Sequence, residues 1–255
     1  MIKLSVCIEM FWTKLPVEER IRRVKAAGYS AFEFWGSSNK DLDAIRAAQA
    51  ETGLACAGIV CEPGNALVER GNDAEMIAGA RRSIAVAQSL GCTRLIVTTG
   101  NVLADESYEI TRRRGVRKLR QMAALADDAG VTLCLEPLNP LVDHKGYWLT
   151  TMAQAADIVE EVASPALTIL YDIYHQQITE GNVIANLRTY ANLIGHIHVA
   201  GVPGRHELVG GELDYRAILS AISEVDYTGY VGLEFRPAGD EETALAEAHS
   251  LLYLA

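Results

Sequence analysis

Four short apolar runs in the second half of the sequence each end on a residue type that binds divalent metal ions. The runs TLCL, TILY, GHI and YVGL are followed directly by Glu136, Asp172, His198 and Glu234. Three carboxylates and one imidazole suit Mg²⁺ or Mn²⁺, and also Co²⁺, whereas structural zinc sites more often use thiolates. Buried carboxylates that lie together repel one another unless a cation relieves the repulsion. The pattern therefore predicts one catalytic divalent ion. The alternative is that each residue is a separate polar strand end satisfied by backbone hydrogen bonds.

Basic residues close to these positions are candidates for binding a substrate. His175 stands three residues after Asp172, and the Gly/Pro-rich sequence AGVPGRHE contains Arg205 and His206. We expect His175 on the loop that leaves the sixth strand, where its ring can hydrogen-bond a substrate hydroxyl or carbonyl group. Arg205 can clamp a carboxylate, and Glu212 can position the loop. A solvated turn is the alternative for Arg205 and Glu212.

Two further groups of residues leave more than one interpretation open. His196 lies two residues before His198 and faces the same side of its strand, so it is either a residue that contacts a metal ligand or a core histidine. The tryptophans Trp12, Trp35 and Trp148 stand near expected strand ends or in the loops beyond them. They either line an apolar wall of the site or pack in the core.

The whole sequence alternates short apolar runs with longer runs of helical periodicity, which predicts eight βα units around a parallel sheet. The expected strands are 3–8, 31–34, 54–59, 94–98, 132–135, 167–171, 194–199 and 230–233. The expected helices are 16–27, 41–52, 74–90, 115–129, 151–162, 180–192, 215–225 and 240–252. Glycines at 28, 53, 91 and 130 follow expected helices, where a left-handed residue is favoured.

Eight such units in one chain favour closure into a (β/α)₈ TIM barrel. An open, doubly wound sheet is the alternative, but no Gly-x-Gly-x-x-Gly phosphate loop follows the first strand. In a barrel, the active site is built at the C-terminal ends of the strands. The four candidate ligands, which end strands five to eight, are then expected to converge on one mouth.

Composition limits the partners and the compartment. The chain has 255 residues with 49% hydrophobic and 22% charged residues, which is typical of one barrel domain over residues 1–255. A net charge of −10 disfavours nucleic acid and favours a small-molecule partner. The basic cluster 112–120 is expected to be a solvated helix face. Five scattered cysteines predict no disulfide framework, and the absence of a signal peptide or membrane span favours a cytoplasmic enzyme.

Longer stretches of the sequence resemble the hydroxypyruvate isomerase family. They are LEPLN at 135–139, YDIYHQQ at 171–177, GHIHVAGVPGRHE at 195–207 and GLEF at 232–235. The resemblance covers essentially the whole chain, and DIYHQQ and GVPGRHE are its most specific parts. The family belongs to the xylose-isomerase-like barrels, alongside the ketose 3-epimerases.

The resemblance implies that Glu136, Asp172, the residue at 198 and Glu234 bind a metal ion, and that the two glutamates also act as the acid/base pair. Hydroxypyruvate isomerases often carry Gln where this chain has His198, whereas the 3-epimerases carry His. The substrate class therefore stays open between a short oxo-acid, such as hydroxypyruvate giving tartronate semialdehyde, and a free ketose of the tagatose, allulose or ribulose type. The related 2-oxo-tetronate isomerases are a further alternative.

The expected chemistry is proton transfer through an enediolate. A cation that binds adjacent carbonyl and hydroxyl oxygens acidifies the C–H bond between them, and Glu136 and Glu234 move the proton. His175 and Arg205 are expected to hold substrate oxygens. A hydrolase that needs several metal ions, such as the endonucleases of this superfamily, fits the charge and histidine content poorly. A sugar-binding protein leaves the carboxylates without a purpose, and a homo-oligomer is expected by analogy alone.

Overall fold

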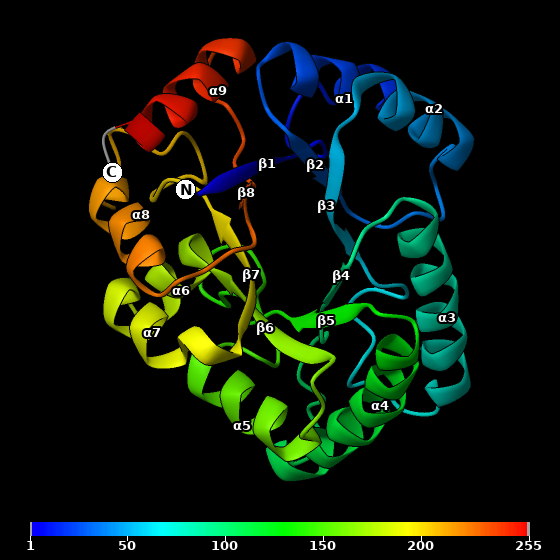
Figure 1. Ribbon diagram of the computed structural model, residues 1–255. Coiled ribbons are helices and arrows are strands. Elements are labelled where there is room, and N and C mark those ends of the chain that lie inside the picture. The colour runs from blue at the N-terminus through cyan, green and yellow to red at the C-terminus, as the bar shows by residue number, and fades with distance from the viewer. Residues whose placement is uncertain (1, 254–255) are drawn as a thin grey trace.

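A computed structural model describes residues 2–253, in which eight parallel strands form a closed barrel in the order of the sequence (Figure 1). The strands are β1 (Lys3–Cys7), β2 (Ala31–Phe34), β3 (Ala55–Val60), β4 (Arg94–Val97), β5 (Thr132–Leu135), β6 (Leu167–Asp172), β7 (Ile194–Val199) and β8 (Tyr230–Leu233). β1 pairs with both β2 and β8, which closes the barrel. The predicted (β/α)₈ barrel is therefore confirmed, and every strand was predicted to within one residue at each end.

Helices surround the barrel on its outside (Figure 1). They are α1 (Val17–Ala26), α2 (Leu42–Thr52), α3 (Asp73–Ser89), α4 (Tyr108–Asp128), α5 (Met152–Val162), α6 (Ile173–Thr179), α7 (Val183–Tyr190), α8 (Tyr215–Glu224) and α9 (Glu241–Ser250). Two 3₁₀ turns, η1 (Ala191–Leu193) and η2 (Leu251–Tyr253), follow α7 and α9.

Local sequence signals start and stop many of these helices. Asp41 begins α2 by accepting hydrogen bonds from two backbone N–H groups, and Thr151 and Gln154 form a capping box at the start of α5. At the end of α2, Gly53 has a φ of 69°, a left-handed conformation that glycine adopts without a steric penalty. Short, well-defined turns of this kind return the chain to the next strand.

The sequence interpretation was wrong about two helices. α4 begins at Tyr108, well before the expected position 115, because Ser107 caps it and the arginines at 112–114 belong to its first turns. α6 was expected to be a loop. Asp172, the last residue of β6, starts this short helix by accepting a hydrogen bond from the backbone N–H of His175 over 3.1 Å. His175 consequently lies within a helix that directly follows the strand.

The basic cluster on α4 is not uniformly solvated. Lys118 is completely buried, and its ammonium group donates to the carbonyl oxygens of Leu67 and Glu69 over 2.9 and 2.7 Å and to the side chain of Asn72. Burial lowers the pKa of Lys118. The other members of the cluster pair mostly with carboxylates. The expectation of a fully solvated helix face was therefore wrong for Lys118, which instead ties the segment after β3 to α4.

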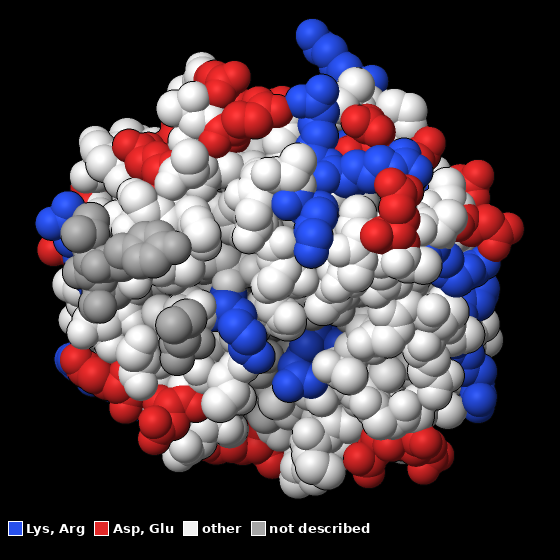
Figure 2. Space-filling model, turned by 45° about the horizontal axis from the view of Figure 1, so that its top comes forward, with Lys and Arg blue, Asp and Glu red and all other residues white. Residues whose placement is uncertain are grey.

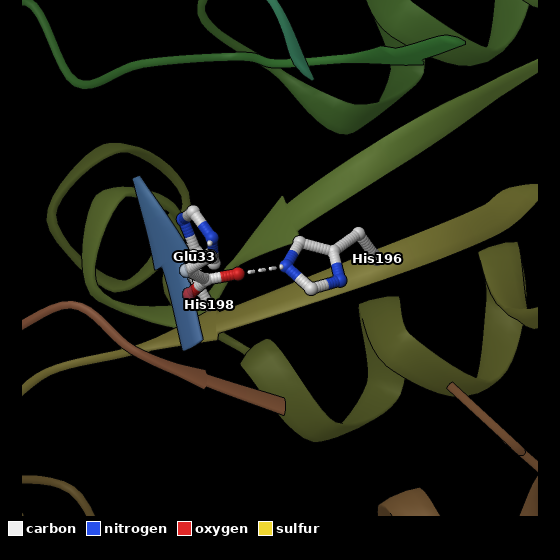
Figure 3. A group of neighbouring side chains, drawn as sticks. All are labelled: Glu33, His196 and His198. Carbon is white, nitrogen blue, oxygen red and sulfur yellow. Dashed lines mark hydrogen bonds and ion pairs between the residues drawn. The ribbon is translucent and has the colours of Figure 1, made fainter. Parts of the chain in front are cut away.

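The inside of the barrel is divided between apolar and polar side chains. Ile96, Cys134 and Leu170 form a small separate apolar cluster there, with Val60 packed against it. Glu33, on β2, is buried beside the imidazoles of His196 and His198 from β7 (Figure 3). All five cysteines of the chain are buried and free, in agreement with the prediction that they form no disulfide framework.

The outer surface carries charges of both signs. On the face shown in Figure 2, basic side chains stand in small groups among acidic ones. Within residues 2–253, no helix combines the length and the apolar character needed to cross a membrane.

Candidate metal centre and active site

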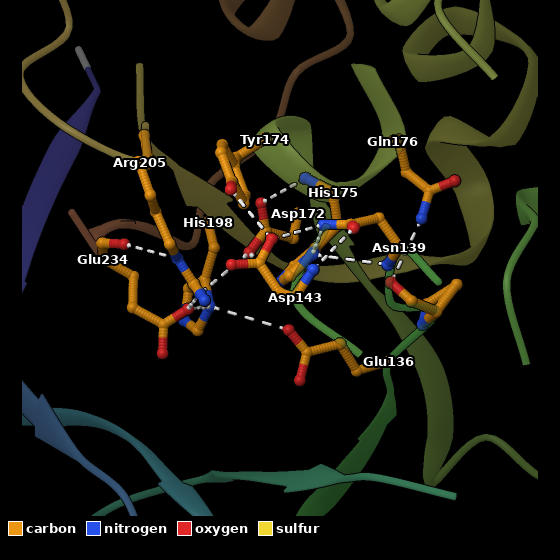
Figure 4. A network of polar contacts seen from close by, with 12 residues as sticks. Glu136, Asn139, Asp143, Asp172, Tyr174, His175, Gln176, His198, Arg205 and Glu234 are labelled. Atoms are coloured by element: carbon orange, nitrogen blue, oxygen red, sulfur yellow. Dashed lines mark hydrogen bonds and ion pairs between the residues drawn. The ribbon is translucent and has the colours of Figure 1, made fainter. Parts of the chain in front are cut away.

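The structure brings the four candidate ligands together at one end of the barrel (Figure 4). Glu136 directly follows β5, Asp172 ends β6, His198 lies in β7 and Glu234 directly follows β8. One ligand atom from each lies within 4.8 Å of the others, and all four residues are buried. Parallel strands of a barrel end at the same rim, which is why residues far apart in the sequence meet here.

The electrostatics of this group suit a cation. Burial and the negative charge of Glu234 raise the pKa of Glu136 to about 8, and burial raises the pKa of Asp172. His198 Nδ1 lies 3.3 Å from Glu234 Oε2, yet it makes no well-aligned hydrogen bond with any described residue. A divalent ion would relieve the repulsion between the carboxylates and accept the lone pair of this nitrogen. These residues therefore fit a divalent metal ion.

The two glutamates differ in how firmly they are held. Glu234 Oε1 accepts a hydrogen bond from the Trp35 indole over 2.7 Å, and Oε2 accepts one from Arg205 Nη2 over 2.5 Å. Although burial raises the pKa of Glu234, the positive charges of Arg205 and His198 outweigh burial and lower it. The backbone N–H of Glu136 donates to the carbonyl oxygen of Val97 in the neighbouring strand β4, and the Glu136 carboxylate faces the cavity. Glu234 is therefore a preorganised carboxylate, whereas Glu136 favours the protonated form.

His175 is completely buried in α6 and presents one ring nitrogen to the site. The backbone N–H of Asn139 points at its Nδ1 over 3.3 Å, so Nδ1 is an acceptor. Burial and the nearby Arg205 lower the pKa of His175, which keeps the ring neutral. The ring proton must then sit on Nε2, which lies 3.6 Å from Asp172 Oδ2 and has no aligned partner among the described residues.

A hydrogen-bond network that the sequence did not reveal supports His175. The Asn139 side-chain amide lies 2.7 Å from both His175 Nδ1 and Asp143 Oδ2, and its oxygen accepts from two backbone N–H groups. Tyr174 donates to the same Asp143 oxygen over 2.8 Å. Gln176 donates to the carbonyl of Pro137 over 3.0 Å. The motif LEPLN contains Asn139, but only the fold shows that it meets α6.

Arg205 reaches the site from the loop after β7, whereas two of its neighbours do not. Its guanidinium lies 3.8 Å from Asp172 Oδ2 and 5.2 Å from the ring centre of Tyr174. His206, the other basic candidate of this loop, does not point into the site, because its ring is exposed and bonds to the Arg236 carbonyl oxygen. Glu212 is exposed too, and its backbone N–H donates to the Val202 carbonyl, which ties the loop together.

A cavity of about 270 Å³ opens between these groups. Its lining comprises Trp35, Val60, Gly64, Asn65, Ile96, Thr98, Glu136, Leu138, His144, His175, His198, Arg205 and Glu234. Among the three tryptophans, Trp35 lines this cavity, whereas Trp12 and Trp148 are buried and lie outside the lining. The cavity thus combines an apolar wall with polar groups at one end, as small-molecule sites do.

Glu33 is another residue near the site that sequence reasoning missed. Its Oε2 lies 2.8 Å from His196 Nε2, and its Oε1 lies 3.3 Å from His198 Nε2. His196 therefore is not an isolated core histidine, because it pairs with a carboxylate that also touches a candidate ligand. A charged residue between two phenylalanines in the strand AFEF was the signal that could have identified it.

Comparison with known proteins agrees with this architecture. The family described as xylose isomerase-like TIM barrel matches residues 21–254. A putative hydroxypyruvate isomerase of Danio rerio is 33% identical, covering 96% of this chain and 94% of the relative. A 2-oxo-tetronate isomerase of Cupriavidus necator is 31% identical, covering 96% of each. A crystal structure named AP endonuclease, family 2, from Brucella melitensis is 25% identical and superimposes with a TM-score of 0.93 over 98% of this chain and 99% of that one.

These matches confirm the resemblance found in the sequence and the prediction of an isomerase-type enzyme. The chain belongs to the family of xylose isomerase-like TIM barrels.

Proposed function

We propose that this chain is a metal-dependent isomerase that converts hydroxypyruvate to tartronate semialdehyde. The observation that carries this proposal is the meeting of Glu136, Asp172, His198 and Glu234 at the rim of a cavity. Mg²⁺ or Mn²⁺, and also Co²⁺, match this oxygen-rich ligand set. When bound, such an ion supplies Lewis-acid stabilisation of the negative charge that develops on the substrate oxygens.

The two glutamates are suited to move the proton. Isomerisation removes a proton from the hydroxymethyl carbon of hydroxypyruvate and adds one to the neighbouring carbonyl carbon, while the hydroxyl becomes a carbonyl and the carbonyl a hydroxyl. Arg205 and Trp35 hold Glu234 as an aligned, ionised carboxylate, which is the form that a proton acceptor needs. Either Glu234 or Glu136 can then return a proton to the adjacent carbon.

His175 and Arg205 have the groups needed to orient an oxo-acid. The Nε2–H of His175 is a donor for a substrate oxygen, and Asn139 fixes this tautomer from the other side of the ring. The guanidinium of Arg205 has five N–H donors, so it can bind Glu234 and still pair with a substrate carboxylate. An anionic substrate is therefore favoured over a neutral one.

The size of the cavity also favours a short substrate. Its volume of about 270 Å³ lies just below the range for small-molecule sites, roughly 300–1,000 Å³. A three- or four-carbon oxo-acid suits such a cavity, so a 2-oxo-tetronate is the second candidate among the acids. A ketose 3-epimerase is the alternative that His198 favours, since the hydroxypyruvate isomerases often have Gln at this position.

Nuclease activity, which the name of the Brucella structure raises, fits this chain poorly. A net charge of −10 opposes binding of a polyanion such as DNA. We therefore propose a small-molecule substrate and no nucleic-acid partner.

Proton NMR in D₂O tests the proposed reaction. The Mn²⁺-activated enzyme is exchanged into Mg²⁺ to avoid line broadening and is incubated separately with hydroxypyruvate, 2-oxo-tetronate, ribulose and tagatose. We expect loss of the C3 proton signal of hydroxypyruvate and formation of tartronate semialdehyde, both abolished by EDTA. Exchange and epimer formation with a ketose alone would move the chain to the epimerases. Turnover that survives complete metal removal would refute metal dependence.

A further inference from the structure

Glu33 is a charged side chain in a place where burial normally excludes one. It lies on β2 between Phe32 and Phe34, and its side chain is only 2% exposed. Figure 3 shows its carboxylate between the rings of His196 and His198. A buried carboxylate is stable only where hydrogen-bond donors or charges satisfy it, so its two neighbours must supply them.

The carboxylate of Glu33 contacts one imidazole with each oxygen. Oε2 lies 2.8 Å from His196 Nε2, and Oε1 lies 3.3 Å from His198 Nε2. Glu33 Oε1 and His198 Nε2 are both buried and lie 3.3 Å apart, and neither makes an aligned hydrogen bond, with the other or with any other described residue. Each is therefore the natural partner of the other.

The barrel leaves space for this arrangement by placing glycines beside it. A Cβ atom at Gly232 of β8 would collide with Glu33 Oε1 and lie 2.7 Å from Cδ2 of the His198 ring. A Cβ at Gly58 of β3 would lie 3.3 Å from Glu33 Oε2 and 3.6 Å from His196 Nε2. β3, which pairs with β2, and β8, which pairs with β7, thus lack side chains where the Glu33 carboxylate and the two rings lie.

The orientation of His198 follows from these contacts. Its Nδ1 lies 3.3 Å from Glu234 Oε2 and 4.0 Å from Glu136 Oε1, on the side of the candidate ligands. Its Nε2 lies on the opposite side, towards Glu33. A histidine that binds a metal ion through one nitrogen commonly donates the other N–H to a carboxylate, which fixes the tautomer and the orientation of the ring.

We infer that Glu33 is a positioning residue, which accepts the Nε2–H of His198 and thereby presents the Nδ1 lone pair to a divalent ion. His196 holds the second carboxylate oxygen and prevents Glu33 from turning away. This inference rests on the proposed metal site but not on the identity of the substrate. A glutamate is required because both of its oxygens accept, whereas glutamine has one acceptor and would set its NH₂ group against one of the two ring N–H groups.

Manganese binding gives the first test. Free Mn²⁺ is measured by electron paramagnetic resonance during titration of the wild-type protein, of Glu33→Gln and of Glu106→Gln. Glu106 is a matched control, because its side chain is 11% exposed and pairs with Arg70 and Arg114 away from the site. We expect Glu33→Gln to weaken Mn²⁺ binding roughly 10–100-fold and Glu106→Gln to leave the Kd unchanged. Equal Mn²⁺ affinity in Glu33→Gln and wild type would overturn the inference, whatever happens to the melting temperature.

A second variant tests the same contact without changing any polar group. In Gly232→Ala, the added methyl group must displace Glu33 or the His198 ring, so we expect a similar loss of Mn²⁺ affinity. Unchanged Mn²⁺ affinity in a folded Gly232→Ala protein would also contradict the inference.

The tautomer of His198 provides a readout that is independent of activity. Long-range ¹H–¹⁵N spectra of the Mg²⁺-loaded, ¹⁵N-histidine-labelled protein distinguish protonated from unprotonated ring nitrogens, and a His198→Gln variant assigns the signals of this ring among the six histidines. We expect a protonated Nε2 and an unprotonated Nδ1. The reverse assignment would overturn the inference.

The outcomes also separate this inference from the proposed reaction. If no candidate substrate is isomerised but Glu33→Gln weakens Mn²⁺ binding, the proposed reaction fails and the role of Glu33 stands. If hydroxypyruvate is isomerised while Glu33→Gln binds Mn²⁺ like the wild type, the reaction stands and the role of Glu33 fails. A wild-type protein that binds no divalent ion would overturn both.

Discussion

The two halves of the barrel contribute differently to the candidate site. Strands β5 to β8 and the residues directly after them supply all four candidate metal ligands: Asp172 ends β6, His198 lies in β7, and Glu136 and Glu234 directly follow β5 and β8. The residues of β1 to β4 and the loops that follow them contribute an apolar wall and small polar groups to the same cavity, namely Trp35, Val60, Gly64, Asn65, Ile96 and Thr98.

This difference indicates a division of roles between the two halves of the closed sheet. The first half shapes the cavity, and the second half supplies the candidate metal ligands and the groups that we propose to move protons. Three residues of the first half nevertheless contact candidate ligands, since Trp35 and Cys7 donate to Glu234 and Glu33 contacts His198. The comparison therefore predicts large activity losses from changes in the second half and mainly losses of stability from changes elsewhere in the first half.

The largest effect is expected for Glu234→Gln. An amide cannot accept the substrate proton, so proton exchange with hydroxypyruvate should fall by about 10²–10⁴-fold. The measurement is solvent deuterium incorporation at C3 at a saturating concentration of Mg²⁺, with Glu106→Gln as a control outside the site. A Glu234→Gln enzyme that exchanges at the wild-type rate with metal bound would remove this glutamate from the acid/base pair.

A smaller but substantial effect is expected for Arg205→Lys. Lysine keeps the charge but loses the planar fork that bonds Glu234, and one charged hydrogen bond contributes about 1.5–3 kcal/mol, or roughly 10–100-fold in kcat/KM. Steady-state kinetics should show a greater loss of kcat/KM for hydroxypyruvate than for an uncharged ketose. The matched control is Arg94→Lys, whose side chain bonds the Gly195 carbonyl at the opposite end of the barrel. Equal losses for the two substrates would argue against carboxylate binding by Arg205.

Lys118→Met should separate stability from activity. The substitution leaves the acceptors of Leu67, Glu69 and Asn72 without their donor. Each unsatisfied buried group lowers the free energy of unfolding by about 1–3 kcal/mol. Thermal unfolding should show a melting temperature lower by roughly 2–4 °C for each kcal/mol lost, with kcat retained.

Arg120→Met, at an exposed position of the same helix, is the control for Lys118→Met and should change the melting temperature little. A loss of kcat in Lys118→Met without a loss of stability would show that the segment after β3 takes part in the reaction.

The smallest effect is expected for Ile96→Val in the apolar wall. Loss of one buried methylene group lowers the free energy of unfolding by about 0.5–1.5 kcal/mol, and the polar groups of the site stay in place. We expect a slightly lower melting temperature and a proton exchange rate close to that of the wild type. An activity loss as large as that of Arg205→Lys would contradict the division between the two halves.

Much of the fold and the outline of the site could be predicted from local sequence. Apolar runs of strand length, helical periodicity and glycine turns identified every strand of the barrel, because these signals depend on residues close together in the chain. α6 escaped detection because it is a single short helix, whose start depends on the Asp172 side chain that also faces the site. The closed barrel then explains why Glu136, Asp172, His198 and Glu234 meet, since parallel strands end at a common rim.

The sequence by itself determined the barrel and the residue types at the ends of its strands. Only the tertiary structure decided which side chains support them: Glu33 and His196 are 163 residues apart in the chain, and Asn139 and His175 are 36 apart. Lys118 looked like a surface residue until packing buried it. The physical reason is that periodicity reports which face of an element is apolar, whereas the partner of a buried polar group depends on which distant segments the closed barrel brings into contact.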